Sequence, residues 1–353
     1  MFIREGIDLR LLNGVLWLIF IVTTIVILRE GKDVFIPLVI ALVAVYLVTI
    51  LSRLVQRISI RGKHLPSLVT MILSFAFIFG VGYALFKLVA ENALLVAEAA
   101  PGFQASLIRV QRDVFSTFGM ETPMEAREII RNLDLQALFT VVASTLAGVL
   151  GKISLVILYS LFILIELRHL DGKLKALFPD PVRRTAIMNI LMRIDSDIHK
   201  YLGVKTAVSM TTALLSYGVM RSVGLQFAEF WALLVFILNY IPTIGSITAT
   251  LLPTLLATVQ FTTLGPILVV GVGILAIQQL MGNVLEPNLM GETLNISPLV
   301  VFCSLIVWGS IWGVVGMFLC VPITVTLIIV LSNFDSTRWV SILLSKSGQA
   351  RER

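Results

Sequence analysis

Polar side chains gather beside two helix-breaking residues within an otherwise apolar stretch, NYIPTIGSITATLLPTLLA. Pro242 removes a backbone donor and Gly245 admits conformations that other residues resist, so a helix through this stretch is predicted to end or unwind. In hydrocarbon the freed backbone groups must find partners inside the protein or face a wet cavity. A kinked packing helix whose hydroxyls bond its own carbonyls is the alternative. The candidate binding residues are Asn239, Pro242, Thr243, Gly245, Ser246 and Thr248.

A second irregular stretch, QQLMGNVLEPNLMGETLNISP, follows further along the chain. Its prolines and glycines argue against a continuous helix and its apolar residues keep it near the core, so it is predicted to be a loop that dips toward the core. A plain surface connection is the alternative. The candidate residues are the polar Gln278, Gln279, Asn283, Glu286 and Asn288 and the backbone-shaping Pro287 and Gly291.

The last apolar run, residues 299–331, carries glycines at helix-packing spacing, Gly309, Gly313 and Gly316, with Pro322 beyond them. Small residues let helices approach closely, so these glycines indicate close helix packing, and a gate is the alternative. The run exceeds the length of one perpendicular span. It therefore predicts a strong tilt, an extension into water or a break near Pro322.

Side chains for covalent or metal chemistry do not occur in recognisable groups. The sequence has no zinc-protease, hydrolase-elbow or nucleotide-binding loop motif, so it predicts neither an enzyme nor a bound cofactor. The histidines, His64, His169 and His199, are far apart in predicted loops, where solvated surface positions are expected and a metal site is not. The two cysteines, Cys303 and Cys320, lie in an apolar run and offer no disulfide framework.

The composition puts these stretches in a membrane. Of 353 residues, 58% are hydrophobic and 14% are charged, whereas about 25% charged residues are typical of a soluble domain. The net charge of +6 comes from short loops without aromatic interleaving, which argues against a nucleic-acid partner and fits the inner face of a membrane. The apolar runs predict an all-α polytopic protein with about eight transmembrane helices and broken or re-entrant elements in its C-terminal half. The predicted spans are residues 11–28, 34–51, 65–90, 141–165, 206–223, 227–259, 264–281 and 299–331.

Lys and Arg favour cytoplasmic loops, and this preference sets the predicted orientation. Residues 52–64 carry four of them and no acid, so that loop and both termini are predicted to be cytoplasmic. An amphipathic helix from Phe103 then falls outside, either on the membrane or at a subunit contact, and a basic amphipathic helix after Pro181 is predicted to lie in the cytoplasmic interface.

The predicted organisation follows from these segments. It comprises three N-terminal spans (1–90), an extracytoplasmic helical insertion (91–140), a fourth span (141–165), a cytoplasmic basic segment (166–205), a C-terminal core (206–331) and a cytoplasmic tail (332–353).

Charge is almost missing from the C-terminal core. No Lys or Arg occurs between Arg221 and Arg338, and the acids before Asp335 are Glu229, Glu286 and Glu292. A permeation path built there has no cationic side chain for an anion, although helix N-termini supply partial positive charge. A neutral, polar small molecule therefore fits such a path best.

Three stretches of the core resemble the autoinducer-two exporter family, also called PerM-type permeases. They are NYIPTIG with the further Pro253, NVLEPNLMG with a downstream proline, and GVVGMFLCVP, which ends at Pro322. The resemblance covers nearly the whole chain and is weaker before Thr206. Members of that family commonly carry an acid shortly after the glutamine that corresponds to Gln279, whereas the nearest acid here is Glu286.

The resemblance implies a bacterial inner-membrane transporter that works without ATP hydrolysis and exports the quorum-sensing signal autoinducer-two or a similar small metabolite. In some relatives it implies sodium/proton exchange. Residues 206–331 are then a transport core in which 239–246 and 283–291 line one pathway. Two alternatives stay open: a cation/proton antiporter that titrates Glu286 or Glu229, and a membrane scaffold that transports nothing. The expected partners are membrane lipid, a small-molecule substrate and further copies of the chain in a homo-oligomer.

Overall fold

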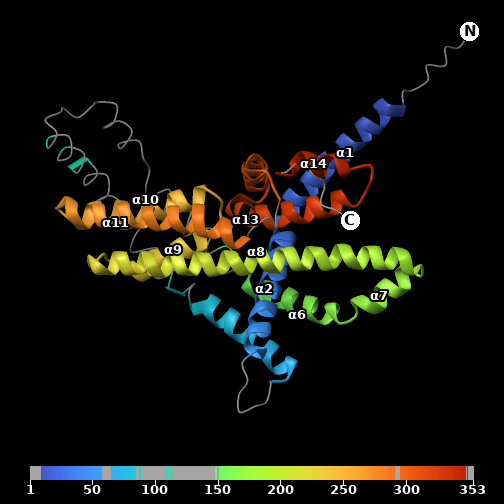
Figure 1. Ribbon diagram of the computed structural model, residues 1–353, viewed down its shortest axis with the longest axis horizontal. Coiled ribbons are helices and arrows are strands. Elements are labelled where there is room, and N and C mark those ends of the chain that lie inside the picture. Colours follow the sequence, from blue (N-terminus) through green and yellow to red (C-terminus); the bar gives the residue numbers. More distant parts are fainter. Residues whose placement is uncertain are drawn as a thin grey trace, which may run out of the picture.

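Figure 1 shows the computed structural model of the chain. It describes residues 9–57, 65–84, 151–290 and 295–346, together with positions 87, 88, 108, 109, 112, 116, 148 and 348. Over these residues the regular secondary structure is helical, and the one β-type pairing is an isolated bridge between Ile296 and Ser345. The predicted all-α class is confirmed. Apart from those single positions, the predicted extracytoplasmic helix from Phe103 lies outside the described residues.

The N-terminal half follows the predicted spans. α1 (Leu9–Glu30) and α2 (Lys32–Gln56) coincide with the first two, and the third is the helix Ser67–Ala84. The described part of the fourth is α6 (Ile153–Leu167), which packs along α2 and is followed, after a bend of 60°, by α7 (Leu170–Leu177). These helices expose long apolar faces, as lipid contact requires.

α8 (Pro181–Ser222) is the helix around which the other elements are arranged (Figure 1). The carboxylate of Asp180 accepts the Val182 N–H at 3.0 Å and a proline occupies the first helical position, both of which favour a helix start. Its 42 residues make it about 63 Å long at 1.5 Å per residue. The predicted interfacial helix and the predicted span 206–223 are thus one unbroken helix. A straight helix cannot lie flat in the interface at one end and cross the membrane at the other, so these two predictions do not hold together.

The predicted span 227–259 is instead a pair of short helices, α9 (Ala228–Leu238) and α10 (Ile244–Gln260). They have 11 and 17 residues, so each is shorter than a hydrocarbon core of about 30 Å at 1.5 Å per residue. The side chain of Gln260 accepts the Gln226 N–H and donates to the Gly224 carbonyl, both at 2.7 Å. The end of α10 therefore lies beside the start of α9, and the two form a re-entrant hairpin.

The tip of this hairpin turns within very few residues. Thr243 adopts a positive φ of 59°, and Ile241 donates its N–H to the Leu238 carbonyl at 2.8 Å. At Gly245 a Cβ atom would lie 1.8 Å from that same Leu238 carbonyl oxygen, so only glycine allows this approach. The predicted break at 239–246 is confirmed. The unusual backbone conformation falls on Thr243, however, and Gly245 is required for the close approach to Leu238 and not for its own conformation.

α11 (Leu264–Gln279) continues through the π-helix η1 (Leu280–Leu285) into α12 (Glu286–Met290). The predicted loop is therefore wrong for residues 278–290, which remain helical. In the π segment the hydrogen-bond register widens, and the Glu286 N–H bonds the Met281 carbonyl. Pro287, which has no N–H, falls in the first turn of the helix that follows, where the missing donor costs least.

α13 (Pro298–Ser332) is one long helix with a sharp break inside it. The break lies at Gly313, whose φ of 63° and ψ of −142° are not helical, and the helix passes through the buried Pro322 without interruption. A break was one of the three outcomes expected of this long run, but it lies at Gly313 and not near Pro322. After α14 (Arg338–Leu344) the chain returns toward α13, where the Lys346 N–H bonds the Asn295 carbonyl at 3.2 Å.

Four helices of the described residues are long and apolar enough to cross a membrane, or five if the bent pair α6–α7 counts as one span. They are α2, the helix Ser67–Ala84, the continuous α11–α12 and α13. The chain is therefore a multi-pass membrane protein. Of the eight predicted spans, 227–259 is the hairpin and 206–223 is the second half of α8.

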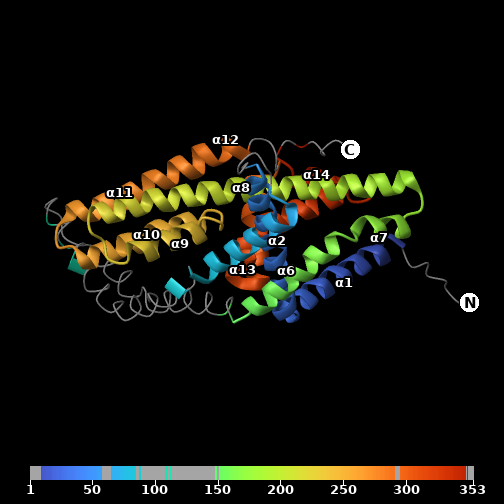
Figure 2. The same ribbon diagram turned by 90° about the horizontal axis from the view of Figure 1, so that it is seen from below.

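The core lies where α8, the hairpin, α11 and α13 meet, and Figure 2 shows the first three side by side. Trp231, Leu202, Met220 and Leu319 from these elements have almost no exposed surface. At the hairpin tip Tyr240, Ile241 and Gly245 are buried against this core, whereas Thr243 and Ile244 are exposed, so protein covers only part of the broken backbone.

Replacing Gly245 with alanine is expected to push the hairpin apart, because its methyl group would meet a backbone carbonyl that cannot rotate away. Overpacking of this kind costs about 1–3 kcal/mol. Thermal unfolding in detergent checks it, with Gly218→Ala as the control, since a Cβ at Gly218 in α8 meets nothing within 4 Å. A Gly245→Ala protein that melts like the control would show that the close approach is not needed.

Candidate functional site

Six side chains from three elements form a polar cluster at the tip of the hairpin. α8 supplies two neighbours, the tip supplies two more, and the helix α11–α12 supplies one from each end of its π segment. Three side-chain hydrogen-bonded pairs connect the three elements in a closed ring. The members of this polar cluster are Lys205, Thr206, Asn239, Tyr240, Gln278 and Glu286.

The first connection is an ion pair between α8 and α12. The ammonium group of Lys205 donates to both carboxylate oxygens of Glu286, at 2.6 and 2.8 Å. The Lys205 side chain is 9% exposed and the Glu286 side chain 20%. A buried charge is tolerated only when it is paired, so each of these two residues depends on the other.

The second connection joins α8 to the hairpin tip. The hydroxyls of Thr206 and Tyr240 lie 2.7 Å apart, and the Thr206 hydroxyl is also within 2.6 Å of the Leu202 carbonyl. The ring of Tyr240 stacks on Phe318 of α13, with 4.7 Å between centroids and 26° between planes. The tyrosine is buried, so its aromatic face is covered by α13 while its hydroxyl bonds α8.

The third connection joins the tip to α11. The Gln278 amide donates to the Asn239 carbonyl oxygen at 2.9 Å. Gln278 is buried and Asn239 is half-buried. Each amide has further donors and acceptors beyond this one bond. The tip is therefore held on one side by a hydroxyl pair and on the other by an amide pair, both uncharged.

The hydroxyls that follow the tip bond their own helix. Ser246 donates to the Thr243 carbonyl at 2.9 Å and Thr248 to the Ile244 carbonyl at 2.8 Å. This is the arrangement that the kinked-helix alternative predicted for them. Thr243 is exposed at the turn, and Pro253 lies buried inside α10. Of the candidate residues in the first stretch, only Asn239 reaches the polar cluster with its side chain; its neighbour Tyr240, which the sequence did not single out, also reaches it.

The second candidate stretch divides in the same way. Glu286 enters the polar cluster, whereas Gln279 and Asn283 are exposed and hydrogen-bond one another. Pro287 and Asn288 are exposed on α12, and Gly291 lies outside the described residues. Glu286 follows directly after the π segment, and there its side chain meets Lys205 of α8.

The glycines of α13 pack within that helix. A Cβ at Gly309 would meet the Met317 side chain at 3.0 Å, and one at Gly316 would lie 1.9 Å from the Trp308 carbonyl oxygen. Both contacts cross the bend at Gly313. The spacing that indicated contact between helices instead allows one helix to fold sharply on itself, with Pro322 beyond the bend.

Sequence reasoning missed Lys205, which it placed in a cytoplasmic basic segment. A signal was available, because Lys205 lies four residues after Tyr201 and continues the apolar face through Ile198, both of which are buried. The segment between Arg221 and Arg338 has no Lys or Arg, but α8 brings the cationic side chain of Lys205 to the polar cluster from outside that segment. Glu286 balances the charge, so the polar cluster as a whole is neutral.

The described histidines do not approach the polar cluster through any bond. His169 is exposed, as predicted, but His199 is 12% exposed and its ring meets Tyr46 edge to face at 4.7 Å, so the prediction of a solvated side chain is wrong for it. His64 lies outside the described residues. Among the described residues no three His, Cys, Asp or Glu side chains are grouped as metal ligands.

Comparisons with known proteins agree across the chain. The family model for AI-2E family transporters matches residues 15–335. The AI-2 transport protein TqsA of Escherichia coli (strain K12) is 31% identical over 343 residues, which cover 95% of this chain and 96% of TqsA. A putative transport protein of Haemophilus influenzae is 28% identical over 345 residues, again covering 95% of this chain and 96% of the relative. The putative permease PerM of E. coli is 43% identical over 49 residues, 14% of each chain.

Removing one partner of the buried ion pair is expected to destabilise the protein strongly. Lys205→Met leaves the carboxylate of Glu286, whose side chain is 20% exposed, without its partner; losses of about 3–5 kcal/mol are typical when the charge left behind is fully buried, so this is the upper end of the expected loss. The loss in the free energy of unfolding is measured by titrating the protein in mixed micelles with a denaturing detergent. The double variant Lys205→Met/Glu286→Leu should recover most of the loss, because no charge is then left unpaired.

The exposed pair between Lys173 and Glu166 provides the matched control, since both side chains are more than half exposed. Lys173→Met is expected to leave the unfolding curve nearly unchanged. If Lys205→Met behaved like Lys173→Met, the ion pair would not be a structural requirement of the fold.

Proposed function

The chain belongs to the AI-2E transporter family, and on that premise we propose that it is an ATP-independent permease that exports a small, neutral, polar metabolite. It is a multi-pass membrane transporter, and the inner membrane of a bacterium is its proposed location. TqsA is named as an AI-2 transport protein, which supports a substrate of the autoinducer-two class. The basic loop after α2 supports cytoplasmic termini.

We assign the pathway to the polar cluster, and one observation carries that assignment. The tip of a re-entrant hairpin is hydrogen-bonded to a different helix on each side, through Thr206–Tyr240 and Asn239–Gln278. A hairpin that enters the protein and returns can tilt without dragging a complete span with it. Substrate sites in transporters commonly lie at such interrupted helices, where polar groups are concentrated.

The free energies of the uncharged bonds and of the ion pair indicate which element moves and which contact stays fixed. A hydrogen bond between neutral groups contributes about 0.5–1.5 kcal/mol net, so releasing both sides of the tip costs about 1–3 kcal/mol. Breaking the Lys205–Glu286 pair costs up to about 3–5 kcal/mol. Alternating conformations must lie within a few kcal/mol of one another. The tip is therefore the element that moves, and the ion pair keeps α8 and α12 together while it does so.

The chemistry of the released groups fits a neutral polar solute. Opening the tip frees two amides, a threonine hydroxyl and a phenol, which together offer donors and acceptors without net charge. A hydroxylated ligand replaces these bonds one for one, so little free energy is lost when it enters. A charged ligand, by contrast, would have to be desolvated against an ion pair that already satisfies itself.

Gln278→Ala tests the pathway, because it removes one ligand-facing amide and one bond to the tip. Flux of autoinducer-two out of liposomes containing the purified protein is expected to fall about two- to tenfold, the loss that one neutral hydrogen bond represents. Gln279→Ala, one residue further along and exposed, is the matched control and should transport like the parent. Equal flux in all three proteins at matched incorporation would contradict the assignment.

A cation/proton antiporter is the second candidate, favoured by the presence of Glu286 in the polar cluster. Measuring the internal pH of the same liposomes with an enclosed indicator distinguishes the antiporter from the permease. Proton movement driven by a sodium gradient, and lost in Glu286→Gln while the protein stays folded, would support the antiporter. An unchanged internal pH with autoinducer-two flux supports the permease.

A further inference from the structure

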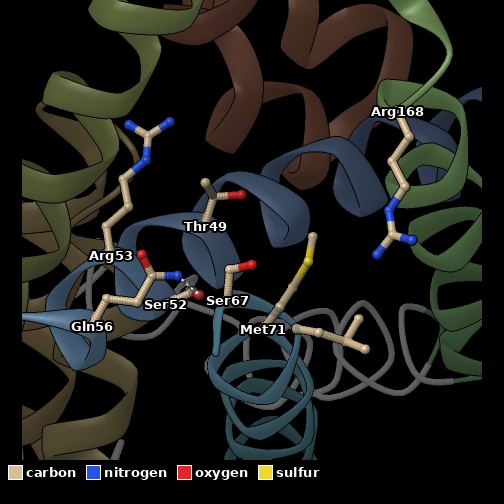
Figure 3. Close-up of a pocket in the computed structure, with 8 residues that line it drawn as sticks. Thr49, Ser52, Arg53, Gln56, Ser67, Met71 and Arg168 are labelled. Carbon is tan, nitrogen blue, oxygen red and sulfur yellow. Dashed lines mark hydrogen bonds between the residues drawn. The ribbon is translucent and has the colours of Figure 1, made fainter. Parts of the chain in front are cut away.

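A pocket of about 340 Å³ lies away from the polar cluster, at the end of α2 (Figure 3). Its walls come from the last two turns of α2, the first turns of the helix Ser67–Ala84 and the bend between α6 and α7. The lining residues are Thr49, Ser52, Arg53, Gln56, Ser67, Leu68, Met71 and Arg168.

The floor of the pocket is fixed by hydrogen bonds between two helices. The hydroxyls of Ser52 and Thr70 lie 2.9 Å apart, and the Gln56 amide donates to Thr70 at 2.9 Å. Ser52 and Thr70 are both buried. The pocket is therefore preformed, because the two helices that make it are joined at its base.

The charge of the pocket is entirely positive. Arg53 and Arg168 stand on opposite sides, with Thr49, Ser67 and Met71 between them (Figure 3). No Asp or Glu is among the lining residues. Two guanidinium groups supply up to ten N–H donors in planar forks that match the oxygens of a phosphate.

One side of the pocket is apolar and continues into a lipid-facing surface. Leu68 and Met71 line it, and Leu68, Ile72 and Leu73 on the same helix are each more than half exposed. Exposed side chains of this kind on an apolar helix lie against acyl chains. The pocket thus combines cationic and hydrogen-bonding side chains with an apolar edge.

We propose that this pocket binds the headgroup of an anionic phospholipid, with the phosphate between Arg53 and Arg168 and the acyl chains along Leu68 and Ile72. The volume is at the small end of ligand pockets, of about 300–1,000 Å³, and suits a headgroup. The basic loop after α2 predicts a cytoplasmic position, where anionic lipids attract clustered cations. A free phosphate would use the arginines but leave the apolar edge unused.

A lipid-retention experiment on the full-length protein tests the proposal. The protein is delipidated in detergent and then returned to micelles that contain equal amounts of phosphatidylglycerol and phosphatidylcholine. Native mass spectrometry counts the lipids retained. The parent should retain phosphatidylglycerol in preference, and Arg53→Gln/Arg168→Gln should retain at least about tenfold less, as expected for the loss of charge-assisted bonds. Arg53→Lys, which keeps the charge but not the planar fork, should fall between them.

Arg57→Gln is the control, because Arg57 lies one turn beyond Arg53 on the same chain segment and does not line the pocket. It should retain phosphatidylglycerol like the parent. Equal losses in Arg57→Gln and the double variant would reveal general surface attraction and overturn the proposal. Displacement of the lipid by inorganic phosphate at equal concentration would assign the pocket to a free anion, and undiminished retention in a folded double variant would also overturn it.

Discussion

The pairing of polar groups inside an apolar core governs this structure. A chain that breaks its own helix between Leu238 and Ile244 must satisfy the groups it frees without help from water. Short backbone bonds close the turn, hydroxyls bond the helix that follows, and the remaining side chains bond the helices on either side. The polar cluster and the close approach at Gly245 both follow from this requirement.

The polar groups are paired with two different strengths, and the proposed transport mechanism rests on that difference. The ion pair between Lys205 and Glu286 fixes α8 against α12, because either charge alone is costly to bury. The uncharged bonds on the two sides of the tip are weak enough for a ligand to replace. An alternating-access transporter needs some contacts that stay fixed and others that a ligand can replace. The long helix α8 contributes to both kinds, with Lys205 in the ion pair and Thr206 in the uncharged bond to the tip (Figure 1).

The residue types in the sequence predicted where the helices break better than they predicted the path of the backbone at each break. Pro242 and Gly245 located the tip, because their backbone limits act within a few residues. The reversal into a hairpin brings the Gln260 side chain to the Gly224 carbonyl, just before the start of α9. These residues are far apart in sequence, so no local pattern predicts the contact. Pro287 suggested a loop, yet it falls in the first turn of α12, directly after the π segment, and the break in α13 falls on a glycine and not on Pro322. Glu286 was identified from its type, whereas its partner was assigned by linear position to another segment, although helical spacing put it on the buried face.

A reversible cross-link between the tip and α11 tests whether the tip must move for a solute to cross. Cysteines at Asn239 and Gln278, in a protein whose Cys303 and Cys320 are replaced by alanine, are joined by a short bis-methanethiosulfonate reagent, and autoinducer-two flux is measured in liposomes before and after reduction. Flux of the double-cysteine protein should stop when the tip is tethered to α11 and return, when the link is cut, to the level that the same protein had before the reagent was added. Full flux through completely cross-linked protein would contradict it.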